Sequence, residues 1–145
     1  MGKFQRGQTI VEFALILPLF ILIFFSIIYA SLIFTDYMSL DNTARNIAHE
    51  ASLCTDDSQF PAVVQKYTST TTLVSDLYIW QPTSSGANNK YLSVKYIPAS
   101  SQVQVDLQAD YNVDGSALAR TMRLLLSAEV GTDVSIQTKI FSKRD

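Results

Sequence analysis

This chain of 145 residues has little of the side-chain chemistry on which enzymes and metal sites depend: one cysteine, Cys54, and one histidine, His49. A single cysteine excludes an internal disulfide, so any oxidation of Cys54 would be intermolecular. His49 has Glu50 beside it rather than one turn away, which excludes a helical metal pair. The pair Asp56-Asp57 lacks the further ligands that a calcium loop requires. No nucleophile, base and orienting acid can be assembled, and no phosphate-binding glycine loop is present, so we expect no enzyme, no metal and no cofactor.

Positive charge is also sparse. The eleven Lys and Arg residues are scattered along the chain, and the formal net charge is −2. A protein that binds nucleic acid gathers basic residues on one face or in one tract. Arg120 and Arg123 lie one turn apart, but a solvated helix face accounts for them. We expect no nucleic-acid partner.

Charge is absent altogether from Phe13 to Phe34. Roughly 22 apolar residues are enough for a helix to cross the hydrocarbon core of a bilayer. An ordinary secretory signal has an apolar region of only about 7 to 15 residues. The small residues Ala30-Ser31 are followed by apolar residues and make a poor cleavage site. The run therefore predicts a single membrane-spanning segment over about residues 13–34.

The charges on either side of this run predict its orientation. Lys3 and Arg6 are the only basic residues before it, whereas the charged residues just after it are mostly acidic. Because cytoplasmic flanks carry the excess of Lys and Arg, the N-terminus is expected in the cytoplasm and the rest of the chain outside.

The helical pattern continues beyond the apolar run. Apolar residues recur at spacings of three and four, at Ile33, Tyr37, Leu40, Ala44, Ile47, Ala48 and Ala51. This spacing predicts one helix from about Thr9 to Leu53. The charged residues Asp36, Asp41, Arg45 and Glu50 are expected off the apolar stripe, so this half should carry a soluble domain on one face. Pro18 removes a backbone hydrogen bond inside the helix and predicts a kink or a locally opened turn.

The remaining residues read as a small mixed domain. The pattern predicts a short helix over residues 59–67, strands near 77–80 and over 91–97, 103–113 and 134–140, a helix over 116–131, and a solvated tail over 143–145. The strands over 91–97 and 103–113 should form an antiparallel hairpin. Strands that follow one long helix indicate an α+β fold, in which the helix packs on a small antiparallel sheet.

Glu12 is the residue that the apolar run does not explain. It lies at the start of the run, in Arg6-Gly7-Gln8-Thr9-Ile10-Val11-Glu12-Phe13. An unpaired carboxylate in hydrocarbon is costly, so Glu12 should either stay near the lipid headgroups or find a cation. A flanking glutamate and a flexible Gly7 are each unremarkable alone. Together, a short basic leader, a glycine, four uncharged residues, Glu12 and Phe13 form a more specific pattern.

This pattern resembles the class III signal of type IV pilin-like proteins, and specifically the TadE-like pseudopilins of the tight-adherence (Tad/Flp) system. The resemblance covers about residues 6–50, from Arg6 to Leu15, through Pro18-Leu19, to Asn42-Thr43-Ala44-Arg45. It implies that a prepilin peptidase cuts between Gly7 and Gln8. Glu12 and Phe13 would then be the fifth and sixth residues of the mature chain.

The resemblance also implies a domain organisation and a role. Residues 1–7 would be the leader, 8–54 the long helix, and 55–145 an extracytoplasmic α+β head. The protein would be a minor pilin or pseudopilin that supports the assembly of Flp-type pili for surface adherence, either within the filament or at its base. Its partners would be the prepilin peptidase, other pilin or pseudopilin subunits, the Tad assembly machinery and the membrane.

A physical role for Glu12 follows from cleavage. The new α-amine of Gln8 would be cationic near neutral pH, and Glu12 could pair with it or with the amine of a neighbouring subunit. Such a pair would set the register of packed helices, which apolar surface in lipid does poorly. The alternative is a single-pass membrane anchor carrying an extracytoplasmic binding or adhesion domain without a role in pilus assembly.

Overall fold

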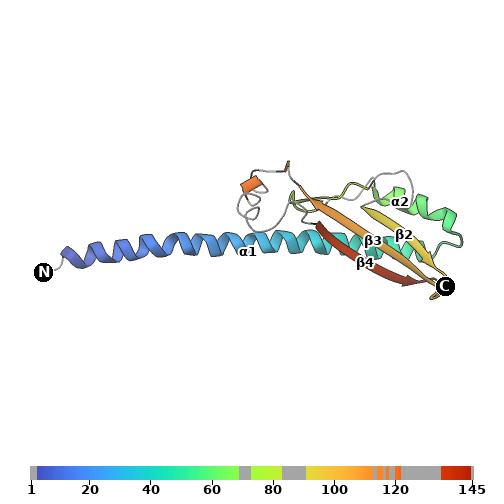
Figure 1. Ribbon diagram of the computed structural model, residues 1–145, viewed down its shortest axis with the longest axis horizontal. Coiled ribbons are helices and arrows are strands. Elements are labelled where there is room, and N and C mark those ends of the chain that lie inside the picture. Colours follow the sequence, from blue (N-terminus) through green and yellow to red (C-terminus); the bar gives the residue numbers. More distant parts are fainter. Residues whose placement is uncertain are drawn as a thin grey trace. The chain divides into compact units, whose positions relative to one another are not determined.

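The computed structural model describes residues 3–68, 73–82, 91–112, 114–115, 117, 120–121 and 135–144, with residues 3–9 described by their backbone. The chain divides into two compact units, Met1–Ile33 and Phe34–Asp145. Helix α1 (Lys3–Ser52) supplies the described part of the first unit and the first element of the second. Figure 1 shows the elements in chain order, with α1 followed by the short helices and the strands.

Helix α1 is longer at its N-terminus than the sequence predicted. It begins at Lys3, so the predicted start near Thr9 is wrong, whereas its end at Ser52 agrees with prediction to within one residue. Lys, Gln and Arg are good helix formers, and the one glycine among these residues, Gly7, costs only about 1 kcal/mol relative to alanine. The helix continues through Pro18, and the predicted kink there stays a prediction.

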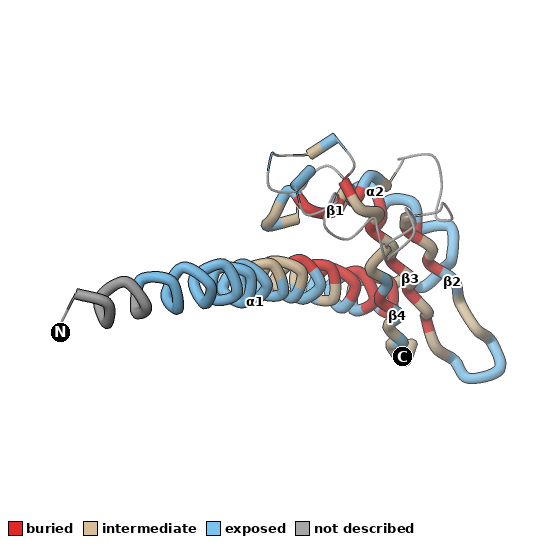
Figure 2. Tube along the Cα trace, turned by 60° about the vertical axis from the view of Figure 1, so that its left-hand side comes forward, coloured by how far each residue is buried: buried red, intermediate tan, exposed pale blue. Residues whose placement is uncertain are grey.

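The first unit exposes apolar side chains on every side of the helix. Residues 10–28 are all exposed, and the large apolar residues from Ile10 to Ile28 are between 39% and 76% accessible. Figure 2 shows this part of α1 in the colour of exposed residues, whereas buried positions occur toward its C-terminal end. The helix is long and apolar enough to cross a membrane. A helix that is apolar all round is suited to lipid or to a bundle of other helices.

The second unit contains a four-stranded antiparallel sheet centred on β3 (Gln102–Tyr111). β2 (Leu92–Ile97) and β4 (Ser135–Lys143) both pair with residues 102–107 of β3, so they lie on opposite sides of it. The two-residue β1 (Tyr78–Ile79) pairs with the other end of β3, on the same side as β2. The predicted α+β fold and the β2–β3 hairpin are confirmed.

The core lies between the C-terminal part of α1, helix α2 (Phe60–Thr68) and one face of the sheet. Alternate residues of β3 are buried, from Val103 to Ala109, as period-two strands require. The buried residues of α1 include Leu40, Ala44, Ile47, Ala48 and Ala51, as the stripe predicted. Tyr37 was also placed on this stripe, but it is 40% exposed, so that assignment is wrong.

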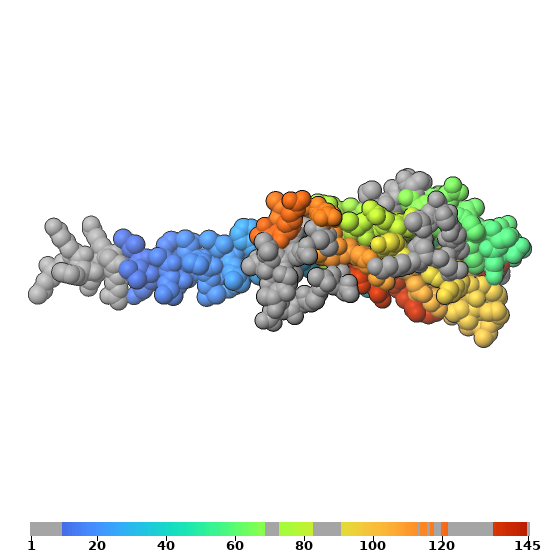
Figure 3. Space-filling view, turned by 45° about the horizontal axis from the view of Figure 1, so that its top comes forward, coloured from blue at the N-terminus to red at the C-terminus, as the bar shows by residue number. Residues whose placement is uncertain are grey.

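Lys143 and Arg144 do not form the solvated tail that the sequence predicts. Lys143 pairs with Gln102 as the last residue of β4. The Arg144 guanidinium donates from Nε to the backbone oxygen of Cys54 at 2.9 Å, and it lies 4.7 Å from the ring centroid of Tyr96. Its Nη1 lies 2.7 Å from Asp57, so the predicted free tail is wrong at Lys143 and Arg144. In Figures 1 and 3, α2 and the β2–β3 turn lie at the same end of the second unit.

Other predicted elements agree within a residue or two or cannot be compared. Helix α2 is preceded by a 3-10 turn over Asp57–Gln59, so the short predicted helix is confirmed with a shift of one residue. The predicted helix over residues 116–131 lies outside the described residues, apart from Ala117, Arg120 and Thr121, which are helical.

Candidate functional site

The predicted cleavage and assembly residues lie within three turns of one helix. The backbone is helical at Gly7 and Gln8, and Glu12 and Phe13 follow on the same helix with exposed side chains, that of Phe13 64% accessible. Residues four apart on a helix share a face and are separated by about 6 Å along the axis. The backbone nitrogen of Gln8 is therefore one turn from Glu12, on the same face.

This spacing has a chemical consequence if the chain is cut after Gly7. The first four N–H groups of the shortened helix would lose their intrahelical partners, and the positive end of the helix dipole would move to Gln8. A new amine at Gln8 would add a charge at the same place. A carboxylate at Glu12 suits that position electrostatically, both within one chain and against the N-terminus of a neighbouring helix.

Three acids farther along α1 contact the rest of the second unit. The sequence placed Asp36 off the buried stripe, but its side chain is 0% exposed, so that assignment is wrong. Its Oδ1 accepts a 2.7 Å hydrogen bond from the backbone N–H of Ser75, and its Oδ2 accepts a second bond from the Ser75 hydroxyl. The Ser75 hydroxyl in turn accepts from the N–H of Leu77 at 3.1 Å. Asp36 therefore binds α1 to the segment that leads into β1.

Asp41 makes a comparable contact with the sheet. Its Oδ1 accepts a 2.8 Å hydrogen bond from the hydroxyl of Thr138 on β4, and its Oδ2 accepts from Arg45 at 2.8 Å. Asp41, which the sequence placed off the buried stripe, thus contacts β4 at one edge of the described sheet.

Glu50 makes the third contact, with α2. Its Oε1 lies 2.6 Å from both the Lys66 ammonium and the Tyr67 hydroxyl. Burial, with the hydrogen bond to Glu50, raises the pKa of Tyr67 to about 12. The phenol therefore stays protonated, and able to donate to Glu50, throughout the physiological range.

The segment after Ser75 is also held from the sheet side. Asn112 donates from its backbone N–H to the oxygen of Leu77 at 2.8 Å. Tyr78 packs edge-on against Tyr111 with ring centroids 5.7 Å apart, and burial, then the proximity of Tyr111 and Asp36, raises the Tyr78 pKa. Trp80 donates from its indole nitrogen to the oxygen of Tyr91 at 3.0 Å. Residues 75–80 therefore contact α1, β3 and Tyr91, the residue before β2.

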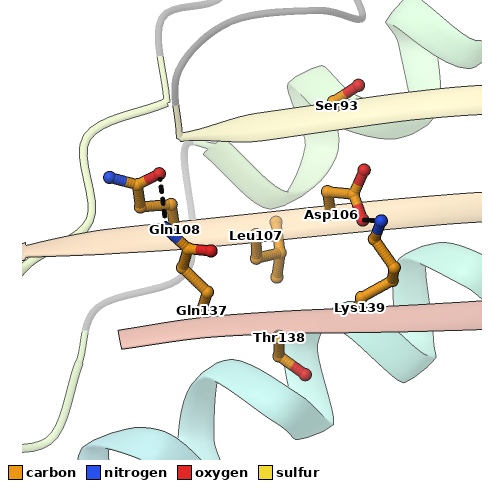
Figure 4. Close-up of a pocket in the computed structure, with 7 residues that line it drawn as sticks. All are labelled: Ser93, Asp106, Leu107, Gln108, Gln137, Thr138 and Lys139. Carbon is orange, nitrogen blue, oxygen red and sulfur yellow. Dashed lines mark hydrogen bonds and ion pairs between the residues drawn. The ribbon is translucent and has the colours of Figure 1, made fainter. Parts of the chain in front are cut away.

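A hollow of about 300 Å³ lies on the face of the sheet opposite α1. Its walls are five polar side chains of β2, β3 and β4, with Leu107 and Thr138 between them. The five are Ser93, Asp106, Gln108, Gln137 and Lys139. Figure 4 shows Lys139 directed toward Asp106 and Gln137 toward Gln108, whereas Thr138 points toward the helix. The Lys139–Asp106 distance is 3.6 Å and the Gln137–Gln108 distance is 3.2 Å. Cross-strand pairs of this kind stabilise a sheet.

The hollow is lined by neither histidine nor cysteine, and its charged pair is Asp106 and Lys139, 3.6 Å apart. Among the described residues, no group of three or more His, Cys, Asp and Glu is placed to hold a metal ion. His49 is exposed on α1.

The sequence predicted the cleavage and assembly residues, and it missed the contacts of the three acids farther along α1. Gly7, Gln8, Glu12 and Phe13 form a local motif, which can be read from one stretch of chain. The contacts of Asp36, Asp41 and Glu50 join residues that are 39, 97 and 16 positions apart, and no local pattern reports them. One signal existed for Asp36, because it is four residues before the buried Leu40 and so fits the same stripe as well as Tyr37 does.

The comparisons with known proteins bear on the N-terminal helix. The family model of TadE-like proteins matches residues 7–49, from the proposed cleavage residue to near the end of α1. No curated protein and no solved structure matches the chain. The family match thus covers most of α1 and none of the strands.

Proposed function

We propose, from the TadE-like character of residues 7–49, that this protein is a minor pilin or pseudopilin of a Tad/Flp-type pilus system. The observation that carries the proposal is that the family match starts at Gly7, within α1 and shortly before residues 10–28, which are exposed and apolar on every side of that helix. A helix of this kind needs lipid or neighbouring helices around it. A subunit that moves from the membrane into a helical bundle is surrounded first by lipid and then by neighbouring helices.

The chain is organised for that role in three parts. Residues 1–7 are a leader that a prepilin peptidase removes, residues 8–54 are the long helix with its membrane part at about 13–34, and residues 55–145 are the head. The basic leader stays in the cytoplasm and the head lies outside. The partners are the peptidase, other pilin or pseudopilin subunits and the Tad assembly machinery.

Glu12 acts in assembly rather than in membrane insertion. In the membrane, it lies at the edge of the hydrocarbon, where a carboxylate is tolerated. In a bundle, it pairs with the amine of Gln8 in its own chain or in a neighbour. Apolar side chains contact lipid as favourably as they contact another helix, so a polar contact is needed to fix the register between subunits.

A deletion strain tests the proposal. Removal of this chain from its host is expected to abolish Flp-type pili and surface adherence, and the wild-type chain supplied in trans is expected to restore both. Electron microscopy and an adherence assay measure the two outcomes. Normal pili in the deletion strain would contradict an assembly role.

A further inference from the structure

Asp36 has an unusual position in the sequence and is buried in the fold. Stability alone does not explain why an acid occupies this place. It is the first charged residue after the apolar run. It is also completely buried, four residues before the buried Leu40 and eight before the buried Ala44. An apolar side chain would fit such a stripe. Replacing both members of a buried hydrogen-bonded pair by apolar groups of similar volume is often neutral or stabilising, so packing alone does not require an acid paired with Ser75 here.

An apolar residue at position 36 would change the membrane segment. The uncharged run now ends at Thr35, which gives about 35 Å of helix from Phe13 at 1.5 Å per residue, close to the hydrocarbon thickness of about 30 Å. Without the acid, the run would continue to Leu40 and measure about 42 Å. A run that is too long is accommodated by tilting or by drawing more of the helix into lipid.

Ser75 holds the carboxyl of Asp36 at a fixed place. Both oxygens of Asp36 are bonded, one to the N–H and the other to the hydroxyl of Ser75. Ser75 belongs to the segment that Asn112 and Trp80 attach to the sheet through the bonds described above. An exposed acid could follow the membrane surface by bending its side chain, whereas this one moves only if the contact with Ser75 breaks.

We propose that Asp36, held by Ser75, is a positioning residue that sets the point at which α1 leaves the membrane. The inference rests on the membrane anchoring in the proposed function, but not on leader cleavage or pilus assembly. It assigns the Asp36–Ser75 contact a role in membrane position, separate from the role of Glu12 at the other end of the run.

Cysteine labelling in membrane vesicles tests this role on the full-length chain. Cys54 is first replaced by serine, and single cysteines are placed at exposed positions of α1, so that labelling reports lipid rather than burial by the sheet. Tyr37 and Met38 report the boundary, Phe25 the hydrocarbon, and Leu53 the outside; all four are at least 40% exposed. The probe is a membrane-impermeant maleimide added from the side of the head to vesicles prepared from cells without prepilin peptidase.

We expect cysteines at positions 37 and 38 to be labelled in the parent chain. In Asp36→Leu, their labelling should fall by about tenfold, because the water-soluble reagent is excluded from hydrocarbon. The cysteine at position 53 should be unaffected. Asp36→Asn, which keeps a polar side chain that can accept from Ser75, should retain most of the parental labelling. Ser75→Ala should give a smaller loss than Asp36→Leu.

Asp41→Leu is the matched control. Like Asp36→Leu, it removes an acid of α1 that accepts a hydrogen bond from another element of the second unit, but it leaves Asp36 in place. It should leave labelling at positions 37 and 38 unchanged, with Trp80 fluorescence reporting the packing of the head in every variant. Unchanged labelling in Asp36→Leu, or an equal loss in Asp41→Leu, would overturn the proposal. Labelling of the cysteine at position 25 in the parent chain would instead contradict membrane anchoring itself.

Discussion

Replacement of Glu12 by alanine is expected to leave the protein in the membrane and to exclude it from the assembled pilus complex. Membrane insertion depends on the apolar run, which alanine lengthens rather than interrupts. Assembly loses the carboxylate that pairs with the Gln8 amine, and the unpaired amine is then costly in a water-poor bundle. A loss of 1.4 kcal/mol already gives about a tenfold fall in an equilibrium constant, so we expect at least about a tenfold fall in incorporation.

The measurement is the ratio of the chain in the purified pilus or assembly fraction to the chain in the membrane fraction. Glu12→Gln keeps the shape of the side chain without its charge, and it should fail almost as completely as Glu12→Ala. Glu50→Ala is the control, because it removes the same group from the same helix at a place where the partners are Lys66 and Tyr67 of α2. Incorporation of Glu12→Ala at the wild-type ratio would support a membrane-anchored binding domain without an assembly role.

Replacement of Gly7 by leucine is expected to block removal of the leader. A peptidase must draw the backbone around Gly7 into its active site, and a residue without a side chain permits close approach. The helix of the uncut chain runs through this point. Glycine weakens a helix by about 1 kcal/mol relative to alanine, so Gly7 also lowers the cost of opening the helix locally for cleavage. Leucine removes both advantages.

Intact-mass spectrometry of the membrane fraction measures the effect. The Gly7→Leu chain should keep the mass of the full precursor, whereas the wild type should lose residues 1–7. Gly2→Leu is the control, since it makes the same change within the leader away from the proposed cut, and it should be processed normally. Equal processing of the Gly7 and Gly2 variants would show that Gly7 does not define the cleavage site.

The sequence predicted those parts of the fold that depend on local periodicity. The apolar run and its continuation to Ala51 predicted α1, because spacings of three and four allow few other structures. The alternation in residues 103–113 predicted β3, which has the buried and exposed pattern that a half-buried strand requires. These elements are specified by neighbours in the chain.

Long-range contacts were not predictable in the same way. Two positions before Leu40 fitted the stripe, Asp36 and Tyr37, and polarity favoured burial of the tyrosine. The outcome was reversed because Ser75 supplies two hydrogen-bond donors to Asp36, which compensate its burial. Arg144 likewise appeared to belong to a charged tail, and its contacts with Cys54, Asp57 and Tyr96 arise only when the sheet brings the chain end to the α1–α2 junction.

The residues of the candidate site also differ in whether local sequence could predict them. Gly7 and Glu12 could be read from the sequence because the peptidase and the neighbouring helix would recognise a short segment. The acids that bind α1 to the rest of the second unit could not, because each has its partner in another element. Sequence therefore predicted the segment that would be cut and packed, while the structure supplied the contacts that join the helix to the sheet.

The N-terminal sequence of the mature protein, isolated from its native envelope with an active prepilin peptidase, tests the central claim most directly. The account predicts that the mature chain begins at Gln8, with Glu12 as its fifth residue. A mature chain that still begins at Met1 or Lys3 would contradict it.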